Sequence, residues 1–178
     1  MNIKYNIIHN HKRTKESVMS KAGLKVAIEF GAGLKSFKDI SEAEEYYFSY
    51  IDALLECFSQ ICNDENDFFE MDFSVDSLKT IEKWYFHLCE NNGFATLDVI
   101  QEDFEKMMGV YYGEVARKNN EDVKWIVEEY PFVEKKYELL INKGLLSVNV
   151  LNICNDLDNR PSNKRRNFLA REYKHYFM

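Results

Sequence analysis

Proline and glycine are scarce in this sequence. Two of its 178 residues are proline and seven are glycine, and no stretch is rich in proline, glycine or serine. Such stretches form the linkers between domains, so we expect one domain over residues 1–178, with residues 1–20 as a loosely held amino-terminal arm. With 46% hydrophobic residues, a chain of this length can bury a full core.

Long apolar runs are missing as well. The sequence contains no run of about 18 apolar residues, and the apolar part of residues 1–8 is too short for a signal peptide. The four cysteines, at positions 57, 62, 89 and 154, lack the close pairing of a disulfide scaffold. We therefore expect a cytoplasmic protein without membrane contact, whose cysteines are reduced and belong to the core.

The common catalytic and cofactor motifs are also absent. There is no G-x-S-x-G elbow, and Gly31-Ala32-Gly33 starts like a dinucleotide fingerprint but lacks its third glycine, so we interpret it as a turn. Cys57 and Cys62 fall within one apolar helical pattern, without a second Cys or His pair at a zinc-site interval. The sequence predicts no catalytic residue, no metal site and no cofactor.

Three segments do carry a clear helical pattern of apolar residues. The first begins at Ser41, where Ser41 and Glu44 have the spacing of a capping box, and it ends in an acidic loop. The second follows Ser74 or Asp76 and is closed by Asn92 and Gly93. The third runs from about Thr96 to Val115, and its Gly109 and Gly113 indicate that another element approaches it closely.

The remaining segments favour strands and one more helix. Residues 24–30 fit either strand or helix, whereas residues 123–127, 137–141 and 145–148 are typical of antiparallel strands, with a turn at 142–144. Residues 163–176 form a basic amphipathic pattern. The predicted fold class is α+β and mainly helical, with three long helices packed on a small antiparallel sheet and a basic C-terminal helix.

Charge is distributed unevenly along the chain. Residues 39–105 hold 2 Lys/Arg against 18 Asp/Glu, whereas residues 1–38 hold 8 against 2 and residues 106–178 hold 13 against 10. So many like charges repel one another, and an exposed acidic face between Glu42 and Glu105 would attract and select a basic protein partner. The residues that we expect to contact this partner are Asp64, Glu65, Asp67, Glu70, Asp72, Glu102 and Asp103.

Several phrases of the sequence point to a family. S-V-D-S-L-K-T-I-E-K-W at residues 74–84, M-M-G-V-Y-Y-G-E-V at 107–115 and V-K-W-I-V at 123–127 occur in this order. Together, over residues 70–150, they resemble the small bacterial immunity proteins of polymorphic toxin systems. The resemblance implies a non-catalytic inhibitor that binds a cognate protein toxin. The basic ends of the chain depart from a uniformly acidic inhibitor and disfavour a nuclease as the target.

Two other functions remain open from the sequence. Acidic groups such as Glu102 and Asp103 would serve a metal-dependent hydrolase or nucleotide-processing enzyme. A phage or host defence adaptor would instead form a homodimer or larger oligomer through Tyr46, Tyr47 and Tyr50. Nucleic acid is disfavoured on the acidic face, while the basic tail, which contains Arg165 and Arg166, would contact either RNA or DNA or the acidic middle of the chain itself.

Overall fold

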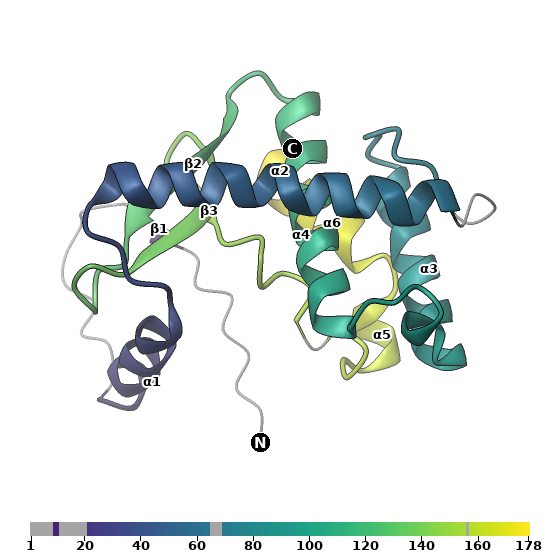
Figure 1. Cartoon of the computed structure of the whole chain (residues 1–178), viewed down its shortest axis with the longest axis horizontal. Coiled ribbons are helices and arrows are strands. Elements are labelled where there is room, and N and C mark those ends of the chain that lie inside the picture. Colours follow the sequence, from purple (N-terminus) through teal and green to yellow (C-terminus); the bar gives the residue numbers. More distant parts are fainter. Residues whose placement is uncertain (1–8, 11–20, 65–68, 156) are drawn as a thin grey trace.

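The computed structural model describes residues 9–10, 21–64, 69–155 and 157–178 (Figure 1). Its long helices are α1 (Lys21–Gly33), α2 (Ile40–Asp64), α3 (Ser77–Asn91) and α4 (Gln101–Asn119). A short 3-10 helix, η1 (Gly93–Ala95), precedes α4, and the chain ends with α5 (Ser162–Arg165) and α6 (Phe168–Phe177). The mainly helical α+β class is confirmed. Residues 2–8, whose sequence also fits a short strand, lie outside the described residues.

The sheet is small and antiparallel. Its strands are β1 (His9–Asn10), β2 (Val123–Glu129), β3 (Tyr137–Lys143) and β4 (Leu146–Val148), in the order β1-β4-β3-β2. β2 and β3 pair along their full length, from Val123 opposite Lys143 to Glu129 opposite Tyr137. Gly144 has a φ of 59° and makes the tight turn into β4, as the glycine at this position predicts. The three predicted strands and their turn are confirmed.

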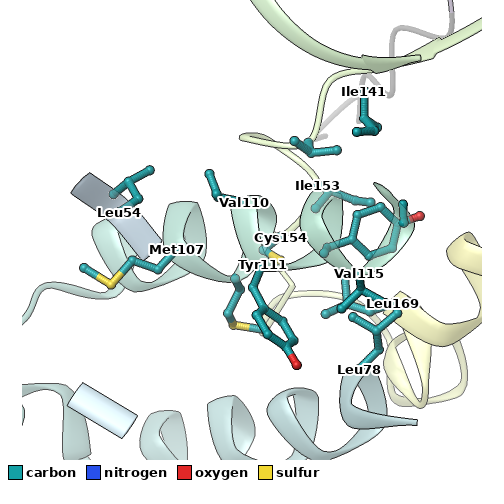
Figure 2. Packing of buried hydrophobic residues seen from close by; sticks show 14 of the residues in the cluster. Leu54, Leu78, Met107, Val110, Tyr111, Val115, Ile141, Ile153, Cys154 and Leu169 are labelled. Atoms are coloured by element: carbon teal, nitrogen blue, oxygen red, sulfur yellow. The ribbon is translucent and has the colours of Figure 1, made fainter. Parts of the chain in front are cut away.

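The core forms around α2 and α4, which contact the sheet, while α3 and α6 pack against each other and against α4. In Figure 1, α2 crosses in front of the sheet and of α4, and Figure 2 shows side chains from several elements converging on α4. Leu54 of α2, Leu78 of α3, Ile141 of β3 and Leu169 of α6 are all buried there. Because each helix presents an apolar stripe at a period of 3.6 residues, the helices share a single hydrophobic cluster.

Close approach to α4 depends on its two glycines. A Cβ atom on Gly109 would lie 2.2 Å from the backbone carbonyl oxygen of Val150, and one on Gly113 would lie 2.2 Å from the ring of Trp125. A side chain at either position would push the neighbouring segment away from the helix. The prediction that these glycines permit a close contact is confirmed.

Several helix boundaries differ from the sequence prediction. Gly31 and Gly33 do not form a turn but lie inside α1, where the missing Cβ of Gly31 makes room for the ring of Tyr130. α4 begins at Gln101 rather than near Thr96, because Asp98 takes a left-handed conformation with a φ of 51°. Asn167 also takes a left-handed conformation, with a φ of 51°, and it divides the expected C-terminal helix into α5 and α6.

Two smaller expectations are also corrected. Ile153, Cys154 and Leu157 follow a helical spacing in the sequence, but residues 151–155 form turns, and the N–H of Leu157 donates to the carbonyl of Cys154. Cys57 is exposed and does not belong to the core, unlike Cys62 and Cys154. Within the described residues, no helix is both long and apolar enough to cross a membrane.

Candidate protein-interaction surface

The longest helix, α2, presents several exposed carboxylates. The start of α2 is held by Asp39 and Glu42: the backbone N–H of Glu42 donates to Asp39 Oδ1 at 3.1 Å, and that of Lys38 donates to Glu42 Oε2 at 2.6 Å. This pair corrects the predicted capping box, which placed the same function two residues later at Ser41 and Glu44. The helix therefore starts early enough to expose Glu42 on its first turn.

One side of α2 is buried and the other is acidic. The buried side carries Ala43, Tyr47, Ile51, Leu54 and Phe58. Exposed carboxylates occupy the opposite side, at Glu42, Glu45, Asp52 and Glu56. At 100° per residue these four positions fall within a stripe about 80° wide and about 21 Å long. We call these four residues the acidic stripe.

Two tyrosines border the acidic stripe. Tyr46 and Tyr50 stack with ring centroids 5.8 Å apart and an angle of 13° between the rings. Together with Glu42, Glu45 and Ser49 they line a shallow depression of about 400 Å³. Tyr46 is 36% exposed, and the Lys35 ammonium lies 3.4 Å from the centroid of its ring. Rigid, half-exposed tyrosines are typical of protein interfaces because they bury large areas at a small cost in entropy.

The start of α4 adds two carboxylates next to these tyrosines. Lys106 Nζ lies 3.0 Å from both Glu102 Oε1 and Asp103 Oδ1. Burial opposes the charge on Lys106, but these two hydrogen bonds raise the pKa of its ammonium above the ordinary value. Partial burial raises the pKa of Tyr50. The positive charge of Lys106 lowers this pKa, and the negative charges of Asp103 and Glu102 raise it. Glu102 and Asp103 thus belong to the same neighbourhood as Tyr50.

The other predicted contact residues lie elsewhere or outside the described part. Asp64 is the last residue of α2, and Glu65 and Asp67 lie outside the described residues. Glu70 and Asp72 are exposed, and the Asp72 carboxylate accepts hydrogen bonds from the backbone N–H and the hydroxyl of Ser74.

These two residues do not join Glu102 and Asp103. The backbone N–H of Phe73 donates to the hydroxyl of Tyr111 at 3.0 Å, which anchors the segment next to Asp72 at the level of Tyr111. Along α4, Tyr111 lies eight residues, or about 12 Å, beyond Asp103. The predicted contact residues therefore form two separate groups, and only the second adjoins the acidic stripe.

The acidic stripe itself was missing from the predicted contact residues. The sequence contained a signal for it, because Glu42, Glu45, Asp52 and Glu56 recur on one side of a strong helical pattern. The patch of three tyrosines expected for an oligomer is also corrected. Tyr47 is only 6% exposed, and its hydroxyl donates to the carbonyl of Tyr137 at 2.7 Å.

The acidic stripe is not neutralised by the basic groups that the structure describes. Among the described residues, the ion pairs within 4.0 Å join Lys25 to Glu29, Lys79 to Asp76, Lys106 to Glu102 and Asp103, and Arg117 to Glu114. The C-terminal arginines bond within their own part of the chain. Arg165 donates to the carbonyl of Asp158, and Arg171 donates to that of Lys164.

The acidic groups of the described residues do not converge into a metal site. In the part of the chain that the structure describes, no group of three or more His, Cys, Asp or Glu residues is arranged to hold a metal ion. At Glu102 and Asp103, the Lys106 ammonium already occupies the position between the carboxylates. A cation there would have to displace Lys106, which disfavours the metal-dependent hydrolase at this place.

Comparison with known proteins gives a family. A family model described as "Uncharacterised protein YwmA" matches residues 36–177, a range that contains α2 to α6 but not α1. The "Uncharacterized protein YwmA" of Bacillus subtilis (strain 168) is 28% identical over 137 residues, which cover 77% of this chain and 86% of that protein. No solved structure was found that matches the chain.

Proposed function

The chain belongs to the YwmA family, and we propose that within this family it is a non-catalytic cytoplasmic binding protein, an inhibitor of the immunity or antitoxin type. Its partner would be a basic protein, and its contact surface would be the acidic stripe together with Tyr46 and Tyr50. Glu102 and Asp103 would extend this surface along α4. The proposal keeps the acidic docking face expected from the sequence but moves its centre from residues 64–72 to α2.

The observation that carries this proposal is the exposure of the acidic stripe. Four carboxylates project from one side of a single helix, and no lysine ammonium or arginine guanidinium of the described residues lies within 4.0 Å of them. Their mutual repulsion costs stability that a basic partner would recover on binding. The two stacked tyrosines supply the apolar contact area that charges alone lack.

The test is capture of the partner with matched variants. Wild-type protein, an E45K/E56K variant and an E90K/E121K control would be used as baits in an extract of the native cell. Glu42 stays intact because it caps α2, and both variants change the net charge equally. We expect wild type and control to retain the same basic protein and the E45K/E56K variant to lose it.

A second step distinguishes an inhibitor from other binding proteins. The captured protein would be expressed alone and together with this chain, and growth would be followed. An inhibitor predicts that the partner arrests growth alone and is harmless in co-expression. Retention of the same protein by the E45K/E56K variant, or a partner without toxicity, would contradict the proposal.

A further inference from the structure

A second charged feature lies away from the acidic stripe, between α3 and the end of the chain. The acidic segment 39–105 contains just two basic residues, Lys79 and Lys83. Both line one cleft of about 440 Å³, and so do Arg165 and Arg166, which follow more than 80 positions later. The fold thus gathers the two lysines of its most acidic segment with two arginines of its basic tail. We call this the basic cleft.

The cations of the basic cleft are largely available to a ligand. Lys83 and Arg166 are exposed, and no carboxylate of the described residues lies within 4.0 Å of Lys83, Arg165 or Arg166. Lys79 Nζ lies 2.6 Å from Asp76 Oδ1, but the Asp76 side chain is 85% exposed. Such a solvated pair contributes little and exchanges readily for a stronger anion.

Two glutamates line the same cleft and do not cancel these charges. Glu82 is 3% exposed, and its carboxylate accepts the backbone N–H of Leu169, so its charge is directed at the start of α6. Glu90 is exposed to solvent. The cleft therefore contains four cations and two carboxylates. The Glu82 carboxylate is hydrogen-bonded to the backbone of α6, and the Glu90 carboxylate is exposed to solvent.

The basic cleft also offers an aromatic surface. Phe86 is half-buried in its lining, and the guanidinium of Arg165 lies 5.1 Å from the centroid of the Phe86 ring. A planar group bound against Phe86 would lie beside Arg165. The volume falls in the range of about 300–1,000 Å³ that small-molecule sites occupy.

From this arrangement we propose that the basic cleft binds a small phosphate-bearing molecule of the nucleotide type. Lys83, Arg165 and Arg166 would hold the phosphate groups, since guanidinium groups match phosphate oxygens in charge and geometry. Phe86 would contact the base. This site is independent of the acidic stripe and goes beyond the proposed partner binding.

The test is calorimetry with two probes, ADP and inorganic pyrophosphate. We expect saturable 1:1 binding of both to wild type, and binding about tenfold weaker or worse in Lys83→Glu and Arg166→Glu. Both residues are exposed, so folding is preserved, which circular dichroism verifies. Lys124→Glu, an exposed lysine on β2, is the matched control and keeps wild-type affinity.

Two further measurements make the ligand class falsifiable. Phe86→Leu should weaken the binding of ADP while leaving that of pyrophosphate within about twofold, because pyrophosphate has no ring to contact Phe86. An eight-nucleotide single-stranded RNA provides the alternative source of phosphate. Absence of binding of both probes, an equal loss in Lys124→Glu, or RNA binding that is much tighter and steeply salt-dependent would overturn the proposal.

Discussion

The carboxylate of Glu82 on α3 accepts a hydrogen bond from the backbone N–H of Leu169, 3.0 Å away in the first turn of α6. Asn167 precedes α6 in a left-handed conformation and makes no side-chain capping bond. The first N–H groups of a helix lack partners within the helix, so a residue 87 positions away provides one. This contact anchors the basic C-terminal helix to α3.

Loss of this cap should cost stability. Glu82→Ala removes a buried charged acceptor, and we expect the free energy of unfolding to fall by about 2 to 3 kcal/mol. Urea denaturation followed by circular dichroism measures it. Glu90→Ala changes an exposed glutamate on the same helix and should stay within about 0.5 kcal/mol of wild type. Equal effects of the two substitutions would show that Glu82 is not a cap.

Glu82 and Glu114 should respond to pH with opposite signs. Burial raises the pKa of Glu82 despite its bonds to the backbone of α6. Burial also opposes the charge of Glu114, but hydrogen bonds from Arg117 and Trp125 outweigh it and lower the pKa of Glu114. The folded state therefore holds the Glu82 proton more tightly, and the Glu114 proton less tightly, than the unfolded chain does.

The linkage between protonation and folding gives the measurement. The quantity to compare is the free energy of unfolding of wild type minus that of Glu82→Gln. This difference should fall as the pH rises above 4.5, the ordinary pKa of a glutamate. The corresponding difference for Glu114→Gln should fall as the pH drops through the window below 4.5. Urea titrations across this range would contradict the assignment if both differences had the same sign.

The glycines of α4 provide a packing test. Gly109→Ala would place a methyl group against the carbonyl of Val150, which is backbone and cannot rotate away, so we expect a loss of about 1 to 3 kcal/mol. Gly33→Ala, at the end of α1, meets no atom within 4 Å and should be neutral or slightly stabilising. Thermal unfolding of both variants provides the comparison, and an unchanged midpoint in Gly109→Ala would contradict the packing.

Thiol reactivity tests the burial of the cysteines. Burial raises the pKa of Cys62 to about 12 and that of Cys89 to about 11, and it raises the pKa of the fully buried Cys154 as well. Only Cys57 is exposed, so a disulfide reagent should modify one thiol quickly in the folded protein and the other three after unfolding. In Cys57→Ser the fast phase should disappear. A fast phase that persists would contradict the placement of α2.

The elements predicted well are those with a local pattern. The stripe of Leu78, Ile81 and Trp84 in α3 and the glycines of α4 reflect contacts that repeat along one helix, so periodicity reveals them. The breaks at Asp98 and Asn167 were missed because these left-handed residues are not glycines. Asp and Asn take the left-handed conformation more often than other non-glycine residues, but a local pattern does not show which Asp or Asn does so.

For the candidate surface, the sequence predicted the acidic charge but not which residues are exposed together. Counting residues located the acidic segment, but Glu82 and Glu105 of that segment are buried, at 3% and 5% exposure. Sequence proximity also grouped Tyr47 with Tyr46 and Tyr50, although a 100° rotation per residue turns Tyr47 into the core. The basic cleft could not be predicted at all, because it brings together α3 and a segment far along the chain.

The central claim is that the acidic stripe of α2 guides the approach of a basic partner. Its most direct test is the association rate constant of the captured partner, measured by stopped flow at several salt concentrations. For E45K/E56K we expect association at low salt to be about tenfold slower or more, with a flatter salt dependence, while E90K/E121K stays close to wild type. Equal rates and equal salt dependence for wild type and E45K/E56K would contradict the claim.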